Sequence, residues 1–195
     1  MTHLLMTTGF LDVASIRTTV DAIVQRGSPD IVLIAQGTLP DQVECQTNLE
    51  LCRDTLEING ISPVLFAEAF IQPMEQANHG TLVIIGSVAG DRGRKSNYVY
   101  GAAKGLVSRY AQGLQHRLAK SKVKVVLIKP GPTDTPMTGH LKGKRAKLAP
   151  VEIVAKQIIQ GIVRAKAVVF SPRRWWFIMM IIRHLPTPIF NKLDI

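Results

Sequence analysis

The chain has 195 residues, of which 46% are hydrophobic and 15 are glycine. This composition excludes an intrinsically disordered chain and predicts one globular domain with a sizeable core. A net charge of +10, from 24 lysine and arginine residues against 14 acidic ones, favours an anionic partner such as a phosphate-bearing substrate, a dinucleotide or an acidic membrane face. A solvated basic surface explains part of the same excess. The sequence contains no nucleic-acid recognition motif.

The cysteines and the first residues bear on the compartment of the protein. Cys45 and Cys52 are seven residues apart, without a CxxC motif or a histidine cluster. Two reduced thiols in a cytoplasmic protein are the simplest interpretation, and no metal site is predicted. The opening MTHLLMTTGFLD has no cationic start and no clean apolar core, so no signal peptide is predicted.

Apolar spacing predicts alternating helices and strands along the chain, beginning with a helix that Asp12 or Ser15 caps. Such alternation indicates an α/β fold with a mainly parallel sheet, in which ligands bind beyond the carboxyl ends of the strands. In chain order the predicted elements are a helix over 13–25, a strand over 31–37, helices over 41–57 and 59–77, a strand over 81–87, a helix over 97–120, a strand over 123–131, a helix over 151–165 and a strand over 167–171.

The clearest chemistry lies in the stretch from Gly86 to Lys104. Tyr100 and Lys104 are four residues apart in a predicted helix, so their side chains share one face, one turn apart. Ser87 ends a predicted buried strand, where it can face that pair across a cleft. A phenol has a pKa near ~10, and a neighbouring ammonium is expected to lower it toward neutrality. A serine hydroxyl can hydrogen-bond a carbonyl or an alkoxide.

Two more segments extend this set. Asn59 lies in LEINGISP, and KPGPTDTPM (129–137) follows a predicted strand with a Pro-Gly pair. In order and spacing, the asparagine, the serine, the Tyr-x-x-x-Lys pair and the Pro-Gly loop resemble the short-chain dehydrogenase/reductase family.

The resemblance implies a Rossmann-like fold, oxidoreductase activity with NAD(P)H and a role for each matching residue. Tyr100 would exchange a proton with the substrate, Lys104 would tune Tyr100 and hold the nicotinamide ribose, Ser87 would orient the carbonyl, and Asn59 would hold a relay water. The implied catalytic residues are Asn59, Ser87, Tyr100 and Lys104. The implied cofactor-binding residues are Ala35, Gly37, Tyr100, Lys104, Pro130, Gly131 and Thr133.

One family feature has no counterpart in this sequence. The family begins with a strand and a TGxxxGxG turn that seats the cofactor pyrophosphate on a helix N-terminus, and the 195 residues contain no such turn. We therefore expect an N-terminally truncated domain that lacks the first two β-α units and binds NAD(P)H weakly. A misassigned start with a longer true protein is one explanation. The alternative is a truncated homologue that acts as an oligomer partner or scaffold without activity.

Other segments resemble family members that reduce a keto-sugar carried by a polyprenyl phosphate, namely RKSNYVYGAAKG, MTGHLKG and RHLPTPIFNKLDI. The resemblance implies a single domain over 1–195, a substrate lid over 135–150 and a hydrophobic tail over 173–195. The tail is expected either to close over the substrate as a core or dimer-facing helix, or to contact the inner face of the plasma membrane through Trp175 and Trp176. In that second case Arg173, Arg174, Arg183 and Lys192 would meet the anionic headgroups.

An exposed strand edge predicts a homo-oligomer. Basic residues at 92–95 and 142–147 are expected either to hold a substrate phosphate or to form solvated surface.

Overall fold

A single parallel sheet organises the protein. The structure is a computed structural model that describes residues 3–141 and 147–193. The strands are β1 (Ile31–Ile34), β2 (Thr81–Ile85), β3 (Lys124–Pro130) and β4 (Val168–Ser171), in the order β1-β2-β3-β4. All three pairings are parallel, so the carboxyl ends of the strands meet at one edge. This arrangement confirms the predicted Rossmann-like α/β fold.

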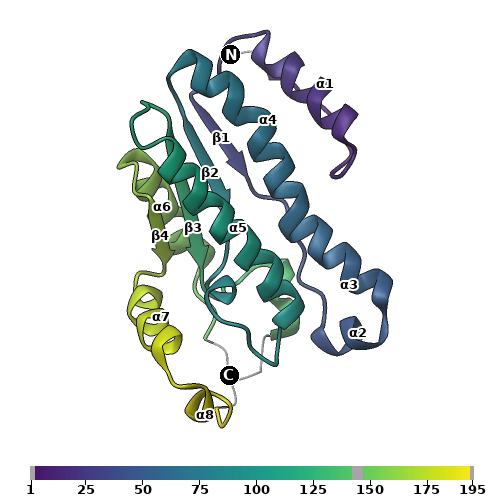
Figure 1. The fold of residues 1–195 in the computed structure, drawn as a ribbon. Helices are drawn as coiled ribbons and strands as arrows, with labels where there is room; N and C mark the ends of the chain where they lie inside the picture. Colours follow the sequence, from purple (N-terminus) through teal and green to yellow (C-terminus); the bar gives the residue numbers. More distant parts are fainter. Residues whose placement is uncertain (1–2, 142–146, 194–195) are drawn as a thin grey trace.

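Helices lie on both faces of the sheet (Figure 1). On one face, α4 (Ser62–Ala77) and α5 (Tyr98–Arg117) pack on the strands, and α1 (Val13–Val24) packs on α4. On the other face, α6 (Val151–Val163) packs on β3 and β4. The N-cap of α1 is Asp12, whose Oδ1 accepts a hydrogen bond from the Ala14 N–H (3.1 Å). The larger core cluster includes Ile16, Ile34, Ile71, Met74, Leu82, Val107 and Leu127, all buried.

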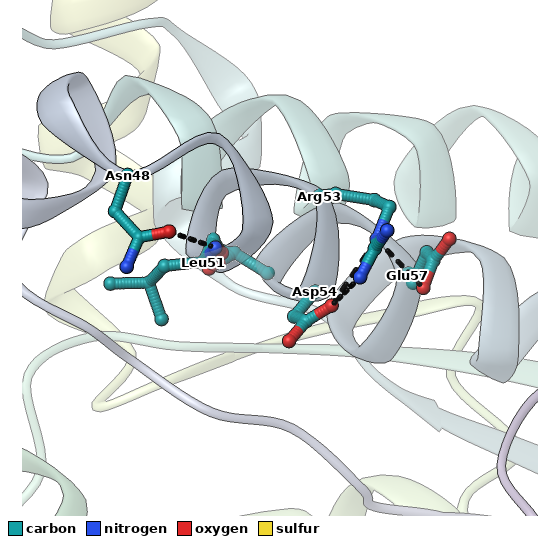
Figure 2. A network of polar contacts seen from close by, with 6 residues as sticks. Asn48, Leu51, Arg53, Asp54 and Glu57 are labelled. Atoms are coloured by element: carbon teal, nitrogen blue, oxygen red, sulfur yellow. Dashed lines mark hydrogen bonds and ion pairs between the residues drawn. The ribbon is translucent and has the colours of Figure 1, made fainter.

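The segment predicted as one helix over 41–57 is two helices, α2 (Gln42–Thr47) and α3 (Leu49–Leu56). The prediction was wrong because Asn48 adopts an extended conformation (φ −124°, ψ 100°). Its Oδ1 accepts a hydrogen bond from the Leu51 N–H at 2.9 Å and thereby caps α3 (Figure 2). Asparagine competes with the helical backbone in this way and so favours a cap over a helix interior. Cys45 and Cys52 therefore lie on different helices, as free thiols.

The expected break between residues 57 and 59 is absent, and α3 continues into α4 through a π-helical turn, Glu57–Ile61. Here the Ser62 N–H bonds to the Glu57 carbonyl, five residues earlier. Pro63 explains the wider turn, because proline has no N–H to donate and its ring crowds the carbonyl four residues earlier. That carbonyl belongs to Asn59. The turn thus inserts Asn59 into a continuous helix.

The remaining elements follow β3 and β4. A 3₁₀ helix spans Pro136–Leu141, and α7 (Arg174–His184) and α8 (Thr187–Phe190) form the tail. Residues 142–146, which belong to the predicted lid and to the predicted basic run 142–147, lie outside the described residues. Within the described ranges, no helix combines the length and the apolarity that crossing a bilayer requires.

Candidate active site

A cavity of about 450 Å³ opens at the carboxyl ends of β2 and β3. Most of its lining is apolar, and five residues that the sequence singles out form part of the wall. These are Ser87, Tyr100, Pro130, Gly131 and Thr133. The rest of the wall includes Leu39, Ile85, Val88, Arg94, Asn97, Met137, Val154 and Ile158. Such a concave, mostly apolar space with a few converging polar groups is typical of a small-molecule site.

Ser87 and Tyr100 meet at this cavity. Ser87 follows β2 and caps the 3₁₀ helix Val88–Asp91, where its Oγ accepts a hydrogen bond from the Ala89 N–H (3.1 Å). Tyr100 lies in the first turn of α5. Burial raises the pKa of the Tyr100 phenol, and a side-chain hydrogen bond with Ser87 and the positive charge of Arg94 partly oppose that rise. The phenol is therefore protonated at neutral pH.

Lys104 is buried one turn along α5 from Tyr100. Its Nζ donates a hydrogen bond to the Ile85 carbonyl at the end of β2 (3.1 Å) and lies 5.8 Å from the centroid of the Tyr100 ring. Burial lowers the pKa of Lys104 to about 8. The expectation that Lys104 brings the Tyr100 pKa down is wrong for this structure. Desolvation of Tyr100 outweighs every opposing effect, and Arg94 is the cation that acts on its pKa.

Asn59 joins the π turn to the loop after β1. It is fully buried, its Nδ2 donates to the Thr55 carbonyl (2.9 Å), and its Oδ1 accepts from the Thr38 N–H (3.0 Å). Gly37 lies against the same group, because a Cβ there would be 2.9 Å from Asn59 Oδ1 and 3.6 Å from Lys104 Nζ. Only glycine allows this close approach. Gly37, Asn59 and Lys104 therefore form one cluster beside the cavity.

The Pro-Gly loop follows β3. The Gly131 N–H bonds to the Ser171 carbonyl (2.8 Å), and Thr133 Oγ1 donates to the Gly131 carbonyl (2.9 Å). A Cβ on Gly131 would lie 1.9 Å from Trp175 Nε1. Trp175 of the tail thus packs directly on the backbone of this loop and supports the wall of the cavity from behind.

The remaining candidate, Ala35, lies elsewhere. It follows β1, is exposed and is not part of the cavity wall.

The basic residues at 92–95 do not share one environment. Arg92 Nη1 donates to the Ile182 and Leu185 carbonyls of the tail (2.7 and 2.6 Å), whereas Arg94 lines the cavity.

Sequence reasoning left one feature of the site open and missed another. The basic residues at 92–95 were expected either to hold a substrate phosphate or to form solvated surface, and the sequence does not tell that Arg94 lines the cavity. The feature that it missed is the buried ion pair between Asp91 and Lys129. The motif letters KPG indicate a loop, but no sequence pattern pairs that lysine with an aspartate 38 residues earlier. Among the described residues, no group of three or more His, Cys, Asp or Glu side chains is placed to hold a metal ion.

A serine and a protonated phenol that share a cavity at the carboxyl edge of a parallel sheet define the class of a Rossmann-like oxidoreductase. Comparison with known proteins agrees. The family model described as short chain dehydrogenase matches residues 4–146. An uncharacterized oxidoreductase of Streptomyces coelicolor is 30% identical over 186 residues, which are 94% of this chain and 72% of the relative. An uncharacterized oxidoreductase of Mycobacterium tuberculosis (strain ATCC 25618 / H37Rv) is 28% identical over 88% of this chain and 68% of the relative.

A solved structure is similar in fold alone. A short chain dehydrogenase from Burkholderia cenocepacia J2315 in complex with NADP superposes with a TM-score of 0.82 at 16% identity, over 98% of this chain and 81% of that chain. With the family match, these findings identify the chain. It belongs to the short-chain dehydrogenase family and is an oxidoreductase, as the resemblance in its sequence implied.

Proposed function

We propose that this chain reduces a ketone with NAD(P)H, or oxidises the corresponding alcohol with NAD(P)⁺. The observation that carries the proposal is the hydrogen bond between Ser87 and Tyr100 at the wall of a 450 Å³ cavity. Two neutral hydroxyl groups at one point can bind a carbonyl oxygen and stabilise the alkoxide that forms from it. The reduced nicotinamide, when bound, supplies the hydride.

Each residue of the pair has a distinct part in the reductive direction. Tyr100 donates its phenolic proton to the oxygen of the reacting carbonyl, and its raised pKa keeps that proton in place at neutral pH. Ser87 already accepts a hydrogen bond from the Ala89 N–H, so its own hydrogen can turn from the Tyr100 oxygen to the same carbonyl oxygen when the substrate binds. Ser87 thereby orients the substrate toward Tyr100.

Lys104 and Asn59 replenish the proton. The Lys104 amine has a pKa of about 8, so it exchanges protons near neutral pH. Gly37 brings the Asn59 and Lys104 side chains to the same place. In our proposal Asn59 holds a water that connects Lys104 to solvent, and Lys104 also holds the ribose next to the nicotinamide.

The cluster fits the nicotinamide end of the cofactor. Gly37 gives backbone access beside Lys104, and Pro130, Gly131 and Thr133 line the adjoining wall. We propose these residues, with Tyr100 and with Ala35, which lies outside the cavity wall, as the cofactor-binding set. Since the 195 residues contain no TGxxxGxG turn, we expect weak binding. A fluorescence titration with NADPH and NADH measures it, and a micromolar dissociation constant would contradict this expectation.

Substitution of Tyr100 tests the assignment. Tyr100→Phe removes the proton donor and keeps the ring, so we expect kcat for ketone reduction to fall by about 10²–10⁴-fold. Tyr98→Phe is the matched control, because Tyr98 lies on the same helix, is exposed and should leave kcat unchanged. Unchanged activity of Tyr100→Phe would refute the proposed role.

For the substrate, we propose a keto-sugar linked to a polyprenyl phosphate, as in decaprenylphosphoryl-2-keto-erythropentose reductase, the partner of decaprenylphosphoryl-ribose epimerase. Such an enzyme would serve cell-wall polysaccharide synthesis. The support is the sequence resemblance together with the apolar wall of the cavity. An activity assay with synthetic prenylphosphoryl keto-sugars, with the free keto-sugar as control, tests this proposed substrate. Equal rates on both would exclude a role for the lipid.

We further propose that residues 173–195 attach the chain peripherally to the inner face of the plasma membrane. In α7, Trp176 (55% exposed), Phe177 (62%) and Ile181 (51%) are apolar and open to solvent, while Trp175 is engaged with Gly131. Trp176→Ser should therefore weaken sedimentation with anionic liposomes, and Val163→Ser, an exposed apolar change on α6, should not. No sedimentation of the unaltered protein at low salt would end this proposal.

We propose that residues 1–195 form a single domain with a lid at 135–150, and that the protein forms homo-oligomers. β1 ends the sheet, and Ile31 and Leu33 on it are 56% and 54% exposed, which favours pairing with a second copy. Size-exclusion chromatography with light scattering measures the molar mass of the protein in solution and hence its oligomeric state. A monomer at high concentration would contradict the oligomer, and Leu33→Lys should dissociate it.

A further inference from the structure

Arg94 gives the cavity its charge. It lies just before α5 and lines the cavity together with Asn97. A backbone hydrogen bond from the Asn97 N–H to the Arg94 carbonyl (3.1 Å) closes the turn that carries both side chains. Of the described residues in the wall, no other has a side chain that is charged at neutral pH.

Within the described part of the chain, the Arg94 guanidinium has no acceptor, because its side chain makes no ion pair or hydrogen bond with another residue there. Its electrostatic neighbour is Tyr100. By contrast, Arg92 donates to two tail carbonyls. Arg94 is half-buried, and this partial burial lowers the pKa of its guanidinium. A guanidinium with five donors in an apolar wall is unfavourable unless a ligand supplies acceptors.

Asn97 adds an independent observation. Its Oδ1 is buried and has no hydrogen-bond partner among the described residues, and the residue lines the same cavity. A buried acceptor without a donor costs free energy, so this atom is suited to a hydroxyl group of a ligand. The turn therefore offers a cationic donor and a neutral acceptor three residues apart in sequence.

We propose that Arg94 and Asn97 form a subsite for an oxyanion of the substrate, a phosphate or a carboxylate, that accompanies a hydroxyl group. The enzyme then selects anionic hydroxy-ketones. A planar guanidinium binds such groups in a bidentate manner. This inference rests on the proposed function, since it sets the anion beside the carbonyl that Tyr100 protonates.

Three-carbon ketones test the selection. The probes are dihydroxyacetone, which is neutral, dihydroxyacetone phosphate and hydroxypyruvate, and the preferred anion identifies phosphate or carboxylate. Arg94→Gln should lower kcat/KM for that anionic ketone by about 10- to 100-fold more than for dihydroxyacetone, whose smaller loss reports the effect of the Arg94 charge on the Tyr100 phenol. Arg109→Gln removes a charge farther along α5 and should change kcat/KM neither for the anionic ketone nor for dihydroxyacetone. Equal losses on charged and neutral ketones would overturn the inference.

A binding measurement separates this inference from the proposed reaction. Titration with inorganic phosphate and with acetate should raise the Tm of the unaltered protein and of Tyr100→Phe, but not of Arg94→Gln. A Tm shift in Arg94→Gln equal to that of the unaltered protein, or no shift in any of them, would overturn the subsite. If Tyr100→Phe stays active while anion binding behaves as expected, the proposed function fails and the subsite stands.

Discussion

Lys129 at the end of β3 and Asp91 in the loop after β2 form an ion pair with almost no access to solvent, since their side chains are 5% and 3% exposed. Lys129 Nζ also lies 5.7 Å from the centroid of the Phe170 ring on β4. The pair joins the loop that carries Ser87 to the strand that leads into Gly131. It therefore holds two walls of the cavity at a fixed separation.

Breaking this pair should cost more than replacing it. Asp91→Asn leaves a buried ammonium without its counter-charge, and we expect a loss of about 3–5 kcal/mol in the free energy of unfolding. The double variant Asp91→Leu with Lys129→Met removes both charges and should recover most of that loss. Urea unfolding measures the free energy of unfolding of the single and the double variant. A double variant less stable than Asp91→Asn would show that the pair itself, and not the uncompensated charge, sets the stability.

Gly131 should not tolerate a side chain. In Gly131→Ala the new Cβ meets Trp175, so we expect a loss of about 1–3 kcal/mol from overpacking together with lower activity. Gly113→Ala, where no atom lies within 4 Å on α5, should instead stabilise by about 0.5–1 kcal/mol. Adding Trp175→Leu to Gly131→Ala should restore part of the stability. Thermal unfolding measures these changes in stability. Equal Tm values for the two alanine variants would contradict the close contact between Gly131 and Trp175.

The stability should increase with pH above about 8 because of Lys104. Burial lowers its folded-state pKa to about 8, from 10.5 as the ordinary value. Between these values the folded chain holds fewer protons at this site than the unfolded chain, so raising the pH favours folding. Below pH 8 both states are protonated and the cost of the buried charge is fully present. Lys104→Met should flatten this rise in urea midpoints measured between pH 7 and 10, and an unchanged slope would exclude Lys104 as its source.

Arg92 should anchor the tail to the site. Its guanidinium bonds to the Ile182 and Leu185 carbonyls and lies 3.8 Å over the Phe190 ring. Arg92→Ala should therefore speed hydrogen exchange in residues 182–193 while leaving α4 protected. Arg183→Ala removes a tail charge whose recorded contact is Met180, and it should leave exchange unchanged. Equal exchange in Arg92→Ala and the unaltered protein would show that the tail docks without it.

Much of the fold was predictable, for identifiable reasons. The runs IVLI, TLVII and VVLIKP read as strands because parallel strands buried on both faces have no polar alternation. Their ends were overestimated because apolar residues continue into the loops around the site. The π turn was missed because a spacing of five residues leaves no mark in a 3.6-residue pattern. Pro63 was the one available sign of it.

The sequence indicated in part which residues lie at the candidate cavity, since Ala35 is not among them, but it did not indicate the electrostatics there. A Tyr-x-x-x-Lys spacing fixes which side chains share a helix face, but it carries no information on burial. Burial reverses the expected direction of the Tyr100 pKa. The same holds for Arg94, because the letters DRGRK do not tell which cation turns inward.

The π turn at Glu57–Ile61 has a consequence for how this chain tolerates length changes. Such a turn equals one residue added to an α-helix, and each helical residue advances the direction of its side chain by about 100°. Deleting Ile58 together with Pro63→Ala would give a regular helix and rotate the Asn59 amide away from Thr38. The two changes together should raise the melting temperature and abolish activity, so selection for thermal stability alone would favour an inactive protein.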